Sequence, residues 1–152
     1  MKFKYRKIPS NSYPGQPWLT RPYLKIRLFS GANYKDVLAL VDSGADSCLF
    51  HASIANELGV NMRAGLRAEF GGIVAGHIVE AFIHRVDLQV EGFAERIGLD
   101  VAFADSDAIG GLLGGLGFLD NYRVILEKYR GRFQVESRPL GDVADVERRH
   151  FK

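Results

Sequence analysis

One aspartate in this sequence stands where a carboxylate could do chemistry. The apolar run at residues 37–41 stops at Asp42, which is followed by Ser43 and Gly44. A carboxylate at the end of a core strand loses part of its hydration. Burying an ion is costly unless the ion is paired, hydrogen-bonded or neutralised. Chains usually carry that cost where the carboxylate has a function. Asp42 is therefore a candidate catalytic residue, and the ordinary alternative is a structural aspartate in an Asx-turn at a strand end.

The other reactive groups do not form a recognisable catalytic or metal-binding set. Cys48 and His51 are three residues apart, but neither an orienting group nor an oxyanion donor accompanies them, so we interpret Cys48 as a buried strand residue. The four histidines lack metal-ligand spacing, and a single cysteine argues against a zinc site. No Lys-Ser/Thr follows the glycines at 110–117, as a phosphate loop would require. We therefore expect neither a metal nor an organic cofactor.

Length and composition predict one ordinary globular domain. The chain has 152 residues, of which 47% are hydrophobic and 25% charged. A formal net charge of +2 gives no reason to expect nucleic acid or an anionic membrane as a partner. Four cations gather near the N-terminus (Lys2, Lys4, Arg6 and Lys7), and we interpret them as the solvated edge of a strand.

The same inventory predicts a cytoplasmic protein. No apolar run reaches the ~20 residues that a membrane-spanning helix needs. The N-terminus lacks the apolar segment of a secretory signal, and a lone cysteine allows no intramolecular disulfide.

The pattern along the chain is that of an all-β barrel or sandwich. Residues 1–22 hold four of the five prolines and are expected to form an irregular lead-in, and the charged residues 137–152 are expected to form a tail. Alternating or continuous apolar residues predict strands, of which 37–41 is expected to be covered on both faces. The predicted strands are 23–29, 37–41, 47–50, 66–70, 78–90, 97–103, 124–127 and 133–136.

Three further segments have a predicted local structure. Residues 52–58 have helical spacing and end at Gly59, a typical residue after a helix C-terminus. Residues 116–121 are expected to form a second short helix. The glycine-rich residues 71–76, between two alternating runs, predict a mobile hairpin tip.

Three motifs in the chain occur in an order that resembles a known family. Residues 40–46 (LVDSGAD) are similar to the active-site signature of retropepsin-like aspartic proteases, the family of the retroviral proteases and their bacterial relatives. Residues 70–78 (FGGIVAGHI) resemble the glycine-rich flap of that family. Residues 112–114 (LLG) resemble its hydrophobic-hydrophobic-Gly element, and 117–124 resemble the continuation seen in bacterial members. The resemblance covers about residues 20–136.

The resemblance implies a fold, an assembly and an activity. The fold would be a small closed β-barrel-like acid protease domain at residues 23–136. The chain holds one Asp-Ser/Thr-Gly, so two copies would form a homodimer in which Asp42 faces Asp42 across the two-fold axis. Two such carboxylates cannot both ionise, so one acts as general base on a water molecule while the other, protonated, polarises the scissile carbonyl. The chain would then be an aspartic endopeptidase.

The resemblance also assigns roles to individual residues. Ser43 would bond across the dimer, and Gly44 would let the backbone approach the carboxylates. An extended peptide or protein substrate would lie under the flap. The implied substrate-binding residues are Ala45, Asp46, Gly71, Gly72, Ile73, Val74, Leu112, Leu113 and Gly114.

One departure from the family pattern concerns the support of the dimer. Viral members often have an arginine after the hydrophobic-hydrophobic-Gly element, paired with the acidic residue that Asp46 matches. Gly115 occupies that place here, so Asp46 lacks this partner. A second interpretation of the same motifs is a catalytically weak or silent dimer that binds peptides or a partner protein, because a fold does not fix a function.

Overall fold

The structure, a computed structural model, describes residues 1–138, and nearly all of its regular elements are strands. The strands are β1 (Lys2–Lys4), β2 (Arg6–Pro9), β3 (Trp18–Arg21), β4 (Tyr23–Ser30), β5 (Asn33–Val41), β6 (Leu49–His51), β7 (Leu66–Val74), β8 (His77–Val90), β9 (Ile97–Ala104), β10 (Gly111–Leu113), β11 (Tyr122–Glu127) and β12 (Arg132–Ser137). The helices are α1 (Ala52–Glu57) and the 3-10 turns η1 (Met62–Ala64) and η2 (Lys128–Arg130). The eight predicted strands and the first predicted helix are confirmed, with shifted ends.

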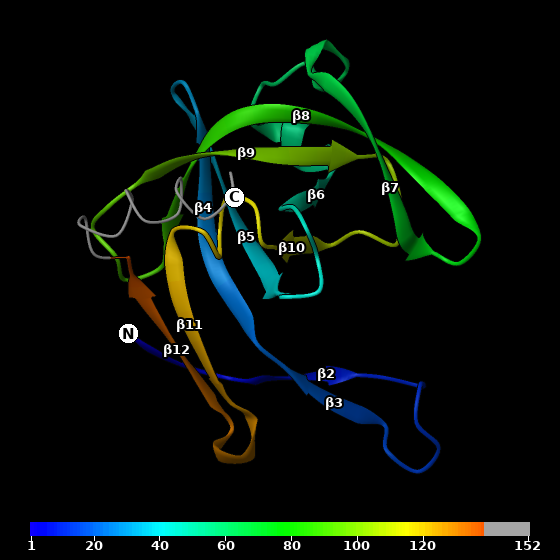
Figure 1. Cartoon of the computed structure of the whole chain (residues 1–152), viewed down its shortest axis with the longest axis vertical. Coiled ribbons are helices and arrows are strands. Elements are labelled where there is room, and N and C mark those ends of the chain that lie inside the picture. The colour runs from blue at the N-terminus through cyan, green and yellow to red at the C-terminus, as the bar shows by residue number, and fades with distance from the viewer. Residues whose placement is uncertain (139–152) are drawn as a thin grey trace, which may run out of the picture.

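Six of the strands close into a ring. The main sheet has the order β4-β5-β10-β6-β9-β8-β7, and β4 also pairs with β8, which joins the two sides of the sheet (Figure 1). β7 extends outward from β8 as the second strand of a long hairpin. Two smaller sheets, β1-β12-β11 and β2-β3, lie beside the ring. The all-β prediction is confirmed, but the extra sheets make the molecule more than a simple barrel.

The core fills the inside of the ring because the strands alternate in polarity. On β4 the side chains of Leu24, Ile26 and Leu28 are buried, whereas Lys25 and Arg27 point outward. The largest buried side chains include Phe50, Phe103, Phe118 and Phe133. None of the helices in residues 1–138 is long and apolar enough to cross a membrane.

The prediction that residues 37–41 are covered on both faces is wrong. Ala39 and Val41 are buried, but Leu38 on the opposite face is 39% exposed. The reason is that β5 lies in the wall of the ring, so only its inner face meets the core. A continuous apolar run therefore marks a strand here without marking two covered faces.

The irregular lead-in predicted for residues 1–22 is also wrong in part, because β1, β2 and β3 lie there. The prolines interrupt no strand: Pro9 ends β2, Pro22 separates β3 from β4, and Ser10 N–H closes the intervening loop by donating to Pro17 O at 2.9 Å. The division of the chain at residue 22 stays a prediction. Most of the predicted tail, residues 139–152, lies outside the described residues.

The helix predicted for residues 116–121 is replaced by turns. Gly117 has a φ of 94°, which a right-handed helix does not allow. The N–H groups of Leu119 and Asp120 instead donate to the carbonyls of Gly114 and Gly115, five residues earlier, at 3.1 and 3.2 Å. By contrast, α1 ends as predicted, with Gly59 at a φ of 69°.

Candidate active site

The position of Asp42 follows from a parallel pairing of two strands that are distant in sequence. β10 lies between β5 and β6 and pairs in parallel with β5, with Leu40 opposite Leu112 and Val41 opposite Leu113. The pairing continues one step past the end of β5, where Asp42 N–H donates to Leu113 O at 3.0 Å. The LVDSGAD and LLG motifs of the sequence are therefore neighbours in the structure.

The loop that follows Asp42 folds back on the carboxylate. Gly44 N–H donates to Asp42 Oδ1 at 2.9 Å, and Ala45 N–H donates to Asp42 O at 3.2 Å. A Cβ at Gly44 would lie 3.2 Å from Oδ1, so glycine permits this close approach. Asp42 is half-buried, and Ser43 and Gly44 are exposed. The carboxylate is thus oriented by backbone and remains open to a ligand or to a second chain.

Residues 114–116 fix the other side of the same loop. Gly115 N–H donates to Ala45 O at 2.8 Å, and Leu116 N–H donates to Asp46 O at 2.7 Å. A Cβ at Gly114 would lie 2.6 Å from Ala45 O and closer still to Ser47 O, far inside normal contact distance. The loop can sit here only because position 114 has no side chain.

The predicted flap residues lie on the β7–β8 hairpin, whereas Asp42 follows β5. β7 continues through Gly71, Gly72 and Ile73 to Val74, with a bulge between Phe70 and Val74, so the turn itself is at residues 75–76. The hairpin is confirmed, although its tip is shorter than residues 71–76. Within residues 1–138, no hydrogen bond joins the hairpin tip to the Asp42 loop.

A second apolar cluster connects the hairpin with β10. Its buried members are Leu49, Ala81, Ala102, Ala104 and Ile109. Ile73 of the hairpin and Leu112 of β10 are among the partly buried side chains that pack against it. Ile73 and Leu112 were among the predicted site residues, whereas the buried members were not, because strand alternation alone does not show which outer face will be covered.

Cys48 and His51 do not form a catalytic pair. Cys48 Sγ is 3.6 Å from Leu116 O, and His51 Nδ1 instead caps α1 by accepting from Ser53 N–H at 3.1 Å. His51 Nε2 lies 3.8 Å from Asp105 Oδ1. Among residues 1–138, no three His, Cys, Asp or Glu side chains are grouped in a way that could hold a metal ion.

Burial raises the pKa of the Cys48 thiol, which leads to a prediction. Because the thiolate is the nucleophile that attacks thiol reagents, we expect native protein to react with them about a hundredfold more slowly than urea-unfolded protein at pH 8. The folded pKa exceeds the unfolded value of about 8.5, so the stability that this group contributes is complete below pH 8.5 and is lost as the pH rises through the folded pKa. Urea unfolding of wild type and Cys48→Val at pH 7.5 and 9.5 measures this pH-dependent stability. An equal decrease in the unfolding free energy of the two proteins between these pH values would refute it.

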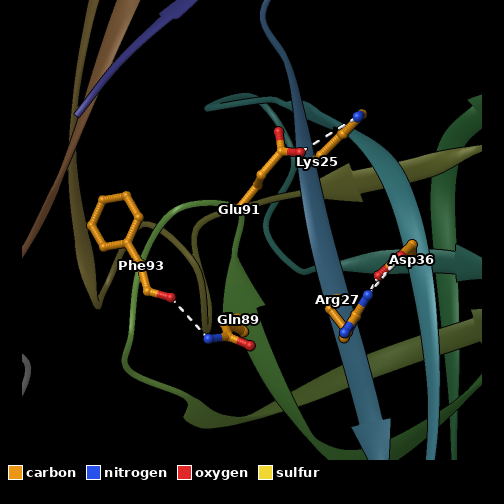
Figure 2. A network of polar contacts seen from close by, with 6 residues as sticks. All are labelled: Lys25, Arg27, Asp36, Gln89, Glu91 and Phe93. Carbon is orange, nitrogen blue, oxygen red and sulfur yellow. Dashed lines mark hydrogen bonds and ion pairs between the residues drawn. The ribbon is translucent and has the colours of Figure 1, made fainter.

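A hollow of about 410 Å³ on the outer side of β4, β5 and the end of β8 is separate from the Asp42 loop. Figure 2 shows that its polar side chains are paired with one another: Arg27 donates to both Asp36 oxygens at 2.6 and 2.9 Å, and Lys25 lies 3.4 Å from Glu91. The hydrogen bond from Arg27 holds the pKa of Asp36 below its usual value. This hollow contains none of the predicted site residues.

Comparison with known proteins agrees with this arrangement. No protein-family model matches the sequence, and no curated protein matches it. Among solved structures, a retropepsin-like aspartic protease from Rickettsia conorii has a TM-score of 0.54 at 14% identity, covering 75% of this chain and 89% of that one. The retroviral protease-like domain of Ddi1 from Leishmania major has a TM-score of 0.53 at 20% identity, covering 82% and 99%. The chain therefore has a retropepsin-like fold.

Proposed function

We propose that this chain is an aspartic endopeptidase that works as a homodimer, with one Asp42 from each copy in a shared site. The observation that carries the proposal is the placement of Asp42 within a retropepsin-like fold. Its main chain is held by Leu113, its Oδ1 by Gly44 N–H, and its carboxylate remains accessible at the end of β5. A single chain offers one such aspartate, so a second copy supplies the other.

The proposed chemistry uses the two carboxylates in different protonation states. Held about 3 Å apart across the two-fold axis, they share one proton. The ionised Asp42 takes a proton from a water molecule as its oxygen attacks the scissile carbonyl carbon, and the protonated Asp42 hydrogen-bonds the carbonyl oxygen. Transfer of a proton to the amide nitrogen then breaks the C–N bond, giving a new carboxyl terminus and a new amino terminus.

The proposed substrate is an extended peptide with apolar side chains near the scissile bond. The second apolar cluster lies behind Leu112, next to the pair of strands that positions Asp42. The β7–β8 hairpin contributes Ile73 to the same cluster and has exposed glycines, Gly71 and Gly72, whose main chain is free of side-chain cover. We propose that this hairpin covers the bound peptide. A cytoplasmic location also stays a prediction.

Cleavage of a mixed peptide library from about pH 4 to 7.5, a range that spans the titration of paired carboxylates, tests the proposal. Wild type and Asp42→Asn protein are assayed side by side. Cleavage by wild type alone supports an aspartic peptidase and gives its side-chain preferences. Equal cleavage by both contradicts it. If both dimeric proteins are silent, the peptide-binding module becomes the better hypothesis.

Leu112→Ala is expected to weaken cleavage more than it weakens the fold. Leu112 is half-buried on the outer face of β10, so we expect a loss of about 1–2 kcal/mol of stability but a drop of about tenfold in kcat/KM for apolar peptides. Leu38→Ala, the same change on the exposed face of β5, is the control and should leave kcat/KM unchanged. Equal effects of the two changes on kcat/KM would argue that the second cluster does not bind substrate.

A further inference from the structure

The β2–β3 hairpin, residues 6–21, is an arm that packs on neither apolar cluster of the described residues. In Figure 1 it extends away from the ring, past the end of β5 and toward the side on which the β7–β8 hairpin also projects. Of the described residues, none in 6–21 belongs to either apolar cluster or packs against one. An isolated two-stranded hairpin is marginally stable in water unless it packs on another surface. The arm therefore has a surface on which another molecule could pack.

One face of the arm combines two arginines with two apolar side chains. Arg6 lies opposite Arg21 and Ile8 lies opposite Leu19, so these four side chains share a face of the hairpin. Like charges directly opposite each other on a sheet repel. Neither arginine forms an ion pair within residues 1–138, and the first acidic residue of the chain is Asp36. The face is therefore complementary to an anionic surface that has an exposed apolar side chain.

The rim of the candidate active site has the complementary character. Asp46, Leu116 and Asp120 are all exposed there, and Leu116 is 62% exposed. Leu116 N–H donates to Asp46 O at 2.7 Å, and Asp120 N–H donates to Gly115 O at 3.2 Å, so the three residues lie on two joined loops. Neither residues 36–62 nor residues 97–122 contain a lysine or arginine. Among residues 1–138, the cation that bonds to the rim is Arg138, which donates to Asp120 O at 3.2 Å.

We propose that the arm of one copy packs on the rim of a second copy, and the reverse, in a two-fold dimer. Arg6 and Arg21 would pair with the carboxylates of the partner's rim, and Ile8 and Leu19 would cover its exposed Leu116. This proposal rests on the proposed dimer and says what holds it. It also supplies a cation for Asp46, which finds none in the described part of its own chain. The partner would then contribute side chains to the rim of the site as well as the second Asp42.

The test measures the dimer dissociation constant of the full chain by sedimentation equilibrium. Arg6→Glu with Arg21→Glu is expected to raise this constant about tenfold or more, because interfacial cations would become anions facing carboxylates. Arg63→Glu with Arg85→Glu changes the net charge equally at η1 and β8, away from the arm, and should change the constant by less than about twofold. Circular dichroism of each variant checks that it is folded.

A rescue keeps the test independent of general damage to the arm. Adding Asp120→Arg to the arm variant recreates opposite charges and is expected to lower the dissociation constant again. If the arm variant dimerises as tightly as wild type, or if Asp120→Arg weakens it further, the arm does not contact the rim, while the proposed peptidase dimer stands. If wild type is a monomer at every concentration, the proposed function itself fails.

Discussion

Asp42→Asn protein is expected to inhibit wild-type protein mixed with it, besides being inactive itself. An asparagine can neither ionise nor share a proton, so we expect the variant's own cleavage rate to fall by about a thousandfold or more. In the proposed dimer each site takes one Asp42 carboxylate from each copy, so a mixed dimer should also be inactive. With a threefold excess of variant and random exchange, a wild-type copy meets another in about one quarter of its dimers. Activity per wild-type chain should therefore fall to about one quarter of its value without the variant.

Asp36→Asn is the matched control for this experiment. Asp36 lies on the same strand, β5, but pairs with Arg27 in the outer hollow, so its variant should form active dimers and leave the mixture's activity unchanged. Copies carrying different tags report whether subunits exchange. If exchange is complete and Asp42→Asn leaves wild-type activity intact, one chain forms a site alone and the shared-site mechanism is refuted.

Gly114→Ala is expected to cost the fold about 3 kcal/mol or more, because overpacking against main-chain atoms cannot be relieved by a rotamer change. The new methyl group would lie 2.6 Å from Ala45 O and nearer still to Ser47 O. Relief requires the Asp42 loop to move off β10, which would also displace the carboxylate. Urea unfolding measures the loss, and we expect residual folded protein to cleave poorly.

The neighbouring glycine provides the comparison. A Cβ at Gly115 would lie 3.4 Å from Asp46 O and 3.7 Å from Ala45 O, which is ordinary contact, and its N–H bond to Ala45 O is unaffected. Gly115→Ala should therefore change the unfolding free energy by less than about 1 kcal/mol. Similar losses for the two variants would mean that glycine matters at both positions through chain flexibility instead of through contact.

The end of a strand at Asp42 could be predicted from the sequence and is confirmed, whereas the role of Asp42 in catalysis stays a prediction. The abrupt end of an apolar run at Asp42 predicted the end of β5, but no strand was predicted at the LLG motif, where β10 pairs with β5. Local signals also predicted α1, because helical spacing and a terminal glycine act over a few residues. What the sequence could not show was the order of strands in the sheet, since it depends on contacts between distant residues. The packing that buries Leu49 and Ile109 in the second apolar cluster depends on such contacts.

The errors have the same origin. The cations near Lys2 indicated the edge of a strand, but no local pattern showed that the partner of this strand is β12, at the other end of the described chain. The face of β5 that holds Leu38 is partly exposed, although its composition is that of a covered strand. At 116–121 the sequence did contain a local signal against a helix, which is its glycine content. Gly117 has a positive φ, which ends helical structure.

The parallel pairing of β5 with β10 has a consequence for how the protein is made. Asp42 is synthesised early, but the strand that fixes its loop comes from residues 111–113, late in the described chain. Non-local pairing of this kind forms only once both segments have left the ribosome and the loop between them has closed. A nascent chain shorter than about 115 residues thus contains Asp42 but lacks the complete β10 strand that fixes its loop. If the protein cleaves peptides, that activity is withheld until residues 111–113 have been synthesised and have paired with β5.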